Sequence, residues 1–305
     1  MKKIKLLSKT LITIGCAFSI QFGFSQDIAL KTDSTESILK PSPKVPEQKN
    51  NGTEKRDVFT LNSKTDIPIT IGCTAWSGYA MTKIYNKGAS SEAQILSLNR
   101  NDINPLDRSA IYGYSSSLDK FSYIPFYAAI PLPLVFFLTG NDMRSDYLKL
   151  TFLYFETLSV TGLFGYSATY FENKYRPYVY DPNTSLSTKM GENAKNSFYA
   201  GHVEIIATST FFISQVYASY YPESKVKWVF YGLAGVSTAG MGYLRLKAGE
   251  HFLSDIFMGG MAGALSGMLV PYFHSHKIIK NKDLSLSPFK SGSTNGLSMV
   301  YRLSK

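Results

Sequence analysis

Histidine is scarce in this sequence, and two of its four histidines stand beside residues that bind anions. His251 follows Arg245 by six positions and precedes Asp255 by four, so one helical turn would bring the Asp255 carboxylate to the imidazole. A carboxylate in that place holds one ring nitrogen as a donor and leaves the other free to attack. Arg245 is close enough in sequence to bind an oxyanion at the same mouth. The spacing therefore predicts a histidine nucleophile beside an oxyanion site.

Two further stretches carry groups of the same kind. Gly201 and His202 stand directly before an apolar segment, where the unpaired amides and positive dipole end of a helix can hold a phosphate. Gly201 permits close approach of the backbone, and His202 could protonate a leaving alkoxide. Lys174 and Arg176, followed by Pro177, end another apolar segment and add positive charge. All three stretches therefore lie at the ends of apolar segments.

Five apolar segments are expected to form the helices that hold these residues, each near the roughly 20 residues needed to cross a bilayer. They are 123–139, 148–171, 203–221, 228–246 and 252–273. A sixth segment, 67–85, is mildly apolar and is interrupted by Pro68, Gly72 and Gly78. The fold class expected is all-α, a membrane-embedded helical bundle with about five to six spanning helices and a flexible N-terminal arm.

The interiors of these segments carry two further signals. Gly259, Gly263 and Gly267 recur at four-residue spacing, which predicts close approach of a neighbouring helix. Ionisable or amide groups are costly in hydrocarbon, so those inside the segments are expected to face a protein interior: Glu156, Glu204, Gln215 and Asp255. A soluble all-helical protein with a large core stays open as an alternative.

The composition favours the membrane interpretation. Hydrophobic residues make up 44% of the 305 residues and charged residues 18%, below the roughly 25% of an average soluble domain. The formal net charge is +10, but no Lys/Arg run is interleaved with aromatic residues, so nucleic acid is not expected as a partner. No His-Glu-x2-His motif or acidic cluster is present, and neither a metal site nor a cofactor is predicted.

The N-terminus has a secretory pattern, with a basic stretch at 2–5, an apolar stretch at 11–24 and cleavage expected after Ser25. An uncleaved anchor is the alternative. Residues 26–66 are expected to form a flexible polar arm, 67–277 the helical domain, and 278–305 a basic tail. With residues 1–25 removed as a signal peptide and five spans, the loops that carry His202 and His251 lie outside and the tail inside. A crossing at 67–85 would invert this orientation.

The order of these motifs resembles the type-2 phosphatidic acid phosphatase family, which is related to bacterial acid phosphatases and vanadium haloperoxidases. That family shows Lys-x6-Arg-Pro, then Pro-Ser-Gly-His, then Ser-Arg-x5-His-x3-Asp. Arg176-Pro177, Gly201-His202 and the stretch from Arg245 to Asp255 match its motifs. The departures are at Thr169, Tyr199, Ala200 and Leu244, where the family has Lys, Pro, Ser and Ser.

The resemblance implies a metal-independent phosphatase that acts on a phosphomonoester or pyrophosphate, with a phosphorylated lipid in a membrane as substrate. By resemblance, His251 forms a phosphohistidine, Asp255 orients it and His202 protonates the leaving group. Arg176 and Arg245 bind the phosphoryl oxygens, and Lys174 is a candidate to replace the missing family lysine. Lipid A, undecaprenyl pyrophosphate and phosphatidylglycerol phosphate are the lipids considered. The expected location is the bacterial inner membrane with the site facing the periplasm. A phosphoryl transferase and an inactive membrane scaffold remain alternatives.

Overall fold

The structure is a computed structural model, and it describes residues 57–276, 284–291 and 294–301. The predicted signal peptide, its cleavage point after Ser25 and residues 26–56 of the predicted polar arm lie outside the described residues. The expectation of an all-α fold is confirmed for residues 57–276, which form helices and connecting loops. The predicted basic tail contains two antiparallel strands, β1 (Leu284–Ser291) and β2 (Thr294–Tyr301), that the sequence interpretation missed.

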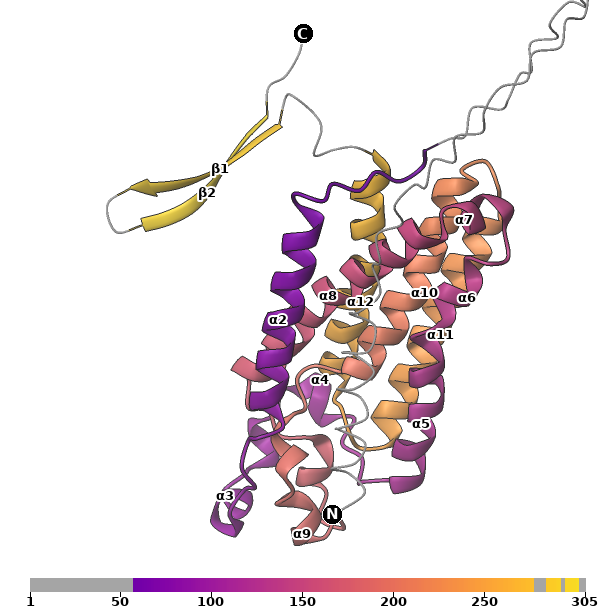
Figure 1. Cartoon of the computed structure of the whole chain (residues 1–305). Helices are drawn as coiled ribbons and strands as arrows, with labels where there is room; N and C mark the ends of the chain where they lie inside the picture. Colours follow the sequence, from indigo (N-terminus) through magenta and orange to yellow (C-terminus); the bar gives the residue numbers. More distant parts are fainter. Residues whose placement is uncertain (1–56, 277–283, 292–293, 302–305) are drawn as a thin grey trace, which may run out of the picture. The chain divides into compact units, whose positions relative to one another are not determined.

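Five helices of 19 to 25 residues make up most of the bundle (Figure 1). They are α2 (Asp66–Ile84), α8 (Tyr147–Phe171), α10 (Gly201–Tyr220), α11 (Val226–Lys247) and α12 (Leu253–His276). Shorter helices connect them: α3 (Glu92–Leu96), α4 (Pro105–Arg108), α5 (Ser116–Ala129), α6 (Leu132–Phe136), α7 (Asn141–Ser145) and α9 (Leu186–Lys189). At 1.5 Å per residue, a helix of 20 residues is about 30 Å long, the thickness of a bilayer core.

The expected apolar helix at 123–139 is wrong as a single element. The chain forms α5 and α6 instead, and the break falls at Ile130 and Pro131. Pro131 and Pro133 supply no amide N–H, so neither can complete the i to i−4 hydrogen bonds of a continuous helix. By contrast, the segment 67–85 forms the unbroken helix α2 despite Pro68. Pro68 lies in the first turn, where amide groups have no intrahelical partner.

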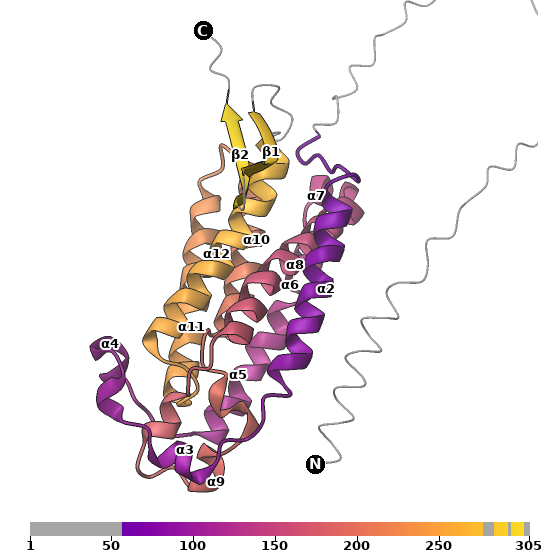
Figure 2. The ribbon, with the colours of Figure 1, turned by 90° about the vertical axis from the view of Figure 1, so that its left-hand side faces the viewer.

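The two ends of the bundle are formed by different parts of the chain. At one end lie the C-termini of α2 and α11 and the N-termini of α5, α10 and α12, with α3, α4 and α9 in the connections (Figures 1 and 2). The carbonyl oxygen of Ile84, at the end of α2, accepts a hydrogen bond from Asn196 in this region. At the opposite end, Asp66 at the start of α2 lies 3.4 Å from His274 of α12. Helix α2 therefore runs the full length of the bundle.

The glycine stripe on α12 contacts α10, as the four-residue spacing predicted. A Cβ at Gly259 would lie 2.6 Å from the carbonyl oxygen of Ala200, and one at Gly267 would lie 2.5 Å from that of Thr208. A Cβ at Gly263 would meet the carbonyl oxygen of Glu204. Only residues without a side chain allow this approach of the two backbones.

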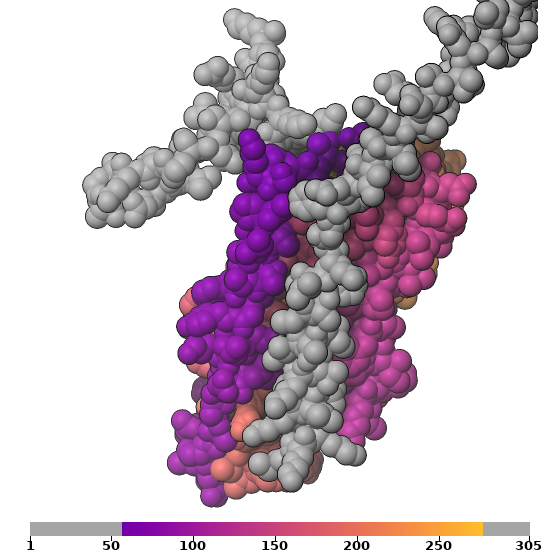
Figure 3. Space-filling view, viewed as in Figure 1, coloured from indigo at the N-terminus to yellow at the C-terminus, as the bar shows by residue number. Residues whose placement is uncertain are grey.

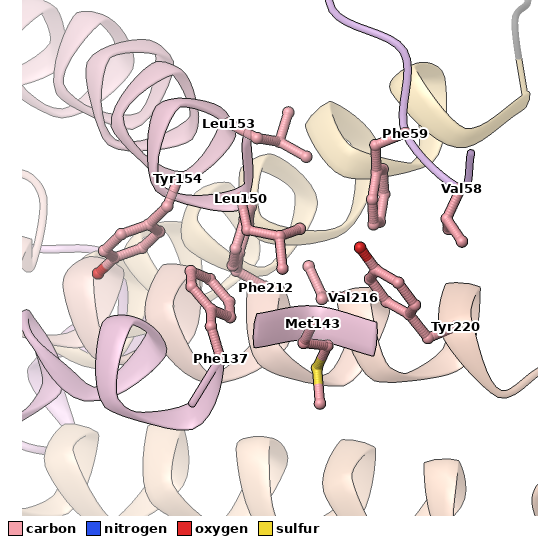
Figure 4. Packing of buried hydrophobic residues seen from close by; sticks show 10 residues of the cluster. All are labelled: Val58, Phe59, Phe137, Met143, Leu150, Leu153, Tyr154, Phe212, Val216 and Tyr220. Atoms are coloured by element: carbon pink, nitrogen blue, oxygen red, sulfur yellow. The ribbon is translucent and has the colours of Figure 1, made fainter. Parts of the chain in front are cut away.

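A hydrophobic cluster packs at the end of the bundle where α2 begins (Figure 4). Phe59, which precedes α2, is fully buried and packs against Tyr220 of α10 with ring centroids 5.7 Å apart. Phe137, Leu150 and Phe212 complete its centre. Segment 57–61 is thus part of the folded domain, although the sequence interpretation placed it in the flexible arm.

The outward faces of several long helices carry large apolar side chains. Helix α2 lies at the surface (Figure 3), with Ile71 63% exposed. Trp228 and Val236 of α11 are 67% and 71% exposed. The ionisable side chains inside the long helices are instead shielded from the surface: Glu156, Glu204 and Asp255 are buried, as predicted. Among the described residues, α12 is the helix whose length and apolar composition qualify it as a candidate membrane span.

Candidate functional site

Five of the residues predicted to form the site line one cavity of about 410 Å³ at the end of the bundle where α10 and α12 begin. Arg176 comes from the loop after α8, Gly201 and His202 from the first turn of α10, Arg245 from the last turn of α11, and His251 from the turn before α12. Segments that lie far apart in the sequence therefore place two imidazoles and two guanidinium groups around the same space.

A tight turn after α11 delivers the nucleophile candidate to this cavity. Gly249 has a φ of 73°, in the left-handed region that favours glycine. A Cβ there would lie 2.5 Å from the carbonyl oxygen of Gly113. The turn is fixed by the amide of Glu250, which donates to the Arg245 carbonyl at 3.1 Å, and by the Gly249 carbonyl, which accepts from Tyr178 at 3.1 Å.

His251 is 3% exposed, and its Nδ1 lies 2.7 Å from the carbonyl oxygen of Ser197. A carbonyl oxygen only accepts, so Nδ1 carries the proton and Nε2 keeps its lone pair. Burial, and then the positive charges of Arg176 and Arg245, hold the pKa of His251 well below its usual value. The imidazole is therefore neutral and oriented, as a nucleophile requires.

The hydrogen bond expected between Asp255 and His251 is replaced by that contact with Ser197. The Asp255 carboxylate instead accepts from Ser197 Oγ at 2.6 Å and from the Phe252 amide at 2.9 Å. Asp255 therefore holds the residue whose carbonyl holds His251. The four-residue spacing predicted the correct neighbourhood but not the intervening serine.

The expectation that Lys174 binds phosphate does not fit its position. Its Nζ lies 2.7 Å from Asp255 Oδ1 and 3.0 Å from Asp107 Oδ2, and it donates to Ser254 Oγ at 2.9 Å. Lys174 is also absent from the residues that line the cavity. Both carboxylates are fully buried, so the ammonium group balances one of their two charges and is not free to bind a ligand.

His202 faces the cavity between two aromatic rings. The ring centroids of Phe126 and Tyr123 lie 4.4 Å and 4.7 Å from that of the imidazole. Its Nε2 is buried and has no hydrogen-bond partner among the described residues. The N-cap residue of α10, Ala200, provides no side-chain cap, so the adjacent amides are open to an anion as well. This nitrogen is therefore available to exchange a proton with a molecule in the cavity.

The two arginines converge on the carboxylate of Glu250, which sequence reasoning did not identify. Glu250 Oε2 lies 2.9 Å from Arg245 and also pairs with Arg176. The other face of the Arg245 guanidinium donates to Asp119 at 2.6 Å and to Ser122 at 2.8 Å. Arg245 is 2% exposed, and its Nε has no hydrogen-bond partner among the described residues. A carboxylate thus occupies the place between the guanidinium groups where an oxyanion was expected.

A second buried acid lies deeper in the cavity wall. Tyr199 donates a hydrogen bond of 2.5 Å to Glu204 Oε1, and a Cβ at Gly165 of α8 would meet the other carboxylate oxygen. Tyr199 stands where the resembled family has proline, so the sequence departure coincides with a polar pair in the wall. Glu204 lies two residues after His202, and this closeness in sequence was the feature from which its place near the site could have been predicted.

One family model matches part of the chain. The family model described as PAP2 superfamily matches residues 149–279. No curated protein matches the chain. One solved structure, described as the first transmembrane PAP2 type phosphatidylglycerolphosphate phosphatase from Bacillus subtilis, is 18% identical, with a TM-score of 0.42 over 70% of this chain and 96% of that chain. Similarity at this level supports no inference about activity.

Proposed function

Because residues 149–279 belong to the PAP2 superfamily, we propose that the chain is a metal-independent phosphatase for a phosphorylated lipid, with His251 as nucleophile. One observation carries the proposal. Two histidines and two arginines from four segments line a single cavity, and the Ser197 carbonyl leaves Nε2 of His251 unprotonated. A phosphomonoester or a pyrophosphate provides the electrophilic phosphorus that such a nitrogen attacks.

The first step forms a bond from His251 Nε2 to phosphorus and breaks the bond from phosphorus to the leaving oxygen. His202 Nε2 donates its proton to that oxygen, and its buried position facing the cavity suits this transfer. The negative charge of the bound phosphate favours the protonated imidazole. In the second step, His202 accepts a proton from water, the water oxygen attacks phosphorus, and the phosphohistidine bond breaks to release phosphate.

Phosphate binding requires the guanidinium groups to change partners. Arg176 and Arg245 both contact Glu250, and an incoming phosphate oxygen takes the place of its carboxylate. Arg245 keeps its hydrogen bonds to Asp119 and Ser122, so its position is maintained through the exchange. The arginines then neutralise charge on the equatorial oxygens as the leaving bond breaks.

A lipid substrate is supported by the depth of the cavity and by the helix surfaces. The cavity walls reach Gly162 of α8, nine residues before the helix ends at Phe171, a depth of about 14 Å. Tyr123, Phe126 and Tyr166 supply aromatic walls there. The exposed apolar side chains of α2 and α11 are suited to contact with acyl chains. A long alkyl phosphate could therefore reach the histidines from the bilayer.

The length of α2 supports a proposed orientation in the membrane. Because α2 runs the full length of the bundle, a membrane-spanning bundle crosses an even number of times, and residues 57 and 276 lie on the same side. The basic residues after α12 favour the cytoplasm for that side, which places the cavity outside. A leader cleaved after Ser25 would place residue 57 outside and the cavity inside, so the two sequence predictions exclude each other. We assign the cavity to the outer side, and labelling of a single cysteine at Ser187 with an impermeant reagent in intact inner-membrane vesicles of known orientation tests this assignment.

The function is tested by turnover of a panel of lipid phosphates with purified wild type, His251→Ala and His276→Gln, with chelator present. We expect loss of turnover in His251→Ala and full turnover in His276→Gln, because His276 is exposed and distant from the cavity. Labelled substrate should leave acid-labile phosphate on His251. Equal turnover in His251→Ala would refute the proposal. Transfer of phosphate to an added alcohol in place of water would support the phosphoryl transferase alternative. Absence of turnover with every substrate would support the inactive membrane scaffold.

A further inference from the structure

Three potential metal ligands meet at the end of the bundle opposite the phosphatase cavity. Asp66 begins α2, Glu156 lies within α8 and His274 lies in the last turn of α12. Nε2 of His274 is 3.4 Å from Asp66 Oδ2 and 3.3 Å from Glu156 Oε2, and one donor atom from each residue lies within 4.8 Å of the others. Asp66 and Glu156 are only 4% and 3% exposed.

In its neutral form, His274 supplies the cluster with no donor, because of how its ring is oriented. Its Nδ1 is 2.8 Å from the carbonyl oxygen of Val270, which can only accept, so Nδ1 carries the proton. In a neutral imidazole, Nε2 then presents a lone pair to two carboxylate oxygens. Glu156 Oε2 is buried and accepts no hydrogen bond from any described residue. Asp66 Oδ2 already accepts a hydrogen bond from the Asn62 amide, so the electron pairs without a donor that face the common space are those of Glu156 Oε2 and His274 Nε2.

A single proton does not complete the cluster electrically. With His274 protonated, two carboxylates and one imidazolium carry a net charge of −1 in a buried position, which is costly. Within the described ranges, no lysine or arginine forms an ion pair with either carboxylate. A divalent cation bound to neutral His274 brings the net charge to zero. A divalent cation is therefore the ligand that balances all the charge of the cluster.

The distances fit a small divalent ion. Zn²⁺ binds imidazole nitrogen and carboxylate oxygen at about 2.0–2.2 Å in a tetrahedron, which places neighbouring ligand atoms about 3.4 Å apart. The two distances from His274 Nε2, 3.3 Å and 3.4 Å, match that edge. The hydrogen bond from Nδ1 to a backbone carbonyl is the contact that commonly orients a metal-bound histidine.

From this geometry we propose that Asp66, Glu156 and His274 bind one Zn²⁺ ion, with water as the fourth ligand. The ion ties the start of α2 to α8 and to the end of α12, next to the point where the Thr60 amide donates to the His274 carbonyl at 3.1 Å. α12 separates this site from His251 by most of its 24 residues, about 30 Å. The metal therefore stabilises the helix ends and takes no part in phosphoryl transfer.

The test uses the full-length protein, with any polyhistidine tag removed. Wild type purified from zinc-replete cells is expected to contain about one Zn²⁺ per chain by mass spectrometry. After stripping with a chelator, it should rebind Zn²⁺ in a calorimetric titration, with a rise in unfolding temperature. His274→Gln and Glu156→Gln are expected to bind more than about tenfold more weakly. His276→Gln, in the same exposed turn, should bind as wild type does.

Wild type that holds no metal and takes up neither Zn²⁺ nor Mn²⁺ after stripping would overturn the proposal, and so would unchanged binding in folded His274→Gln. If the variants do not fold, X-ray absorption of the wild-type zinc decides, because sulfur or several imidazole ligands would place the metal elsewhere. Stripped wild type should keep His251-dependent turnover below its unfolding temperature. Failure of the zinc site is thus distinguishable from failure of the phosphatase.

Discussion

Glu250 stands in the place that the proposed reaction assigns to phosphate, and Glu250→Gln tests that competition directly. In the wild type, one carboxylate oxygen contacts both Arg176 and Arg245. Glutamine keeps the size of the side chain and can still accept a hydrogen bond, but it carries no charge. An incoming phosphate then displaces a neutral amide in place of a carboxylate, so we expect tighter phosphate binding.

The magnitude follows from the two hydrogen bonds that the substitution weakens. A hydrogen bond to a charged partner contributes about 1.5–3 kcal/mol, and a neutral one about 1 kcal/mol. Each of the two hydrogen bonds therefore loses about 0.5–2 kcal/mol, about 1–4 kcal/mol together, and the inhibition constant of phosphate should fall by about fivefold to several hundredfold. The same change leaves buried Arg245 with less compensation, so unliganded stability should fall by about 3 kcal/mol.

The assay measures inhibition by inorganic phosphate together with thermal unfolding at increasing phosphate concentration. Glu250→Gln should unfold at a lower temperature than wild type without phosphate and should gain more from phosphate, because tighter binding stabilises more at a given concentration. Glu192→Gln, which changes an exposed acid in the connection between α9 and α10, is the matched control and should change neither property. An inhibition constant equal to or higher than that of wild type would refute the idea that Glu250 occupies the phosphate position.

Three further predictions concern pH, charge and packing. Burial, and then the nearby arginines, lower the pKa of His251, so the nucleophile stays neutral as the pH falls. The acid limb of the kcat/KM profile should therefore lie below the ordinary histidine pKa of about 6.5. An acid limb at or above that value would contradict the role of His251. Lys174→Met leaves two buried carboxylates without their cation and should reduce the free energy of unfolding by about 3–5 kcal/mol. Inhibition of the folded protein by phosphate should not change. Weaker inhibition by phosphate would show that Lys174 does bind phosphate. Gly263→Ala should cost about 1–3 kcal/mol in denaturant unfolding, because the new Cβ meets Glu204 and Ala207 of α10, whereas Gly232→Ala, with open space around it, should cost nothing from packing.

The long helices could be predicted wherever an apolar run was uninterrupted. The segment 148–171 matches α8 (Tyr147–Phe171), and 228–246 lies inside α11 (Val226–Lys247). The single helix predicted at 123–139 was wrong because the prediction rested on apolar content. Apolar content does not show that Pro131 and Pro133 interrupt the helical hydrogen bonds. Proline position mattered more than proline presence, because Pro68 in the first turn of α2 is harmless.

The side chains that line the cavity were predictable, but their hydrogen-bond partners were not. His202, His251, Arg176 and Arg245 meet at one cavity because the ends of adjacent helices lie together at one end of a bundle. The contact to His251 comes from a backbone carbonyl, at Ser197, and any residue type could have supplied it. Spacing rules that pair side chains therefore assigned Asp255 to a hydrogen bond that it does not make.

The metal cluster shows the same limit more strongly. Asp66, Glu156 and His274 come from three helices far apart in the sequence, so no local spacing motif could reveal them. Their convergence depends on α2 running the full length of the bundle, which the interruptions at Gly72 and Gly78 obscured. The length of α2 also determines the number of crossings in the proposed topology, on which the proposed outer position of the cavity depends. One helix thus contributes to both the proposed cation site and the proposed orientation.

The two ends of the bundle hold opposite chemistry, and their separation makes the experiments independent. The cavity end gathers two guanidinium groups around Glu250, with Asp119 on the other side of Arg245, and the proposed reaction exchanges Glu250 for the phosphate anion. The other end gathers two carboxylates around one imidazole, and a cation is the ligand it lacks. Sites this far apart, with no residue in common, act additively on stability, within about 0.5 kcal/mol. A chelator can therefore lower the unfolding temperature without touching the nucleophile, and loss of turnover in chelator is evidence against the histidine mechanism only where the protein is shown to stay folded.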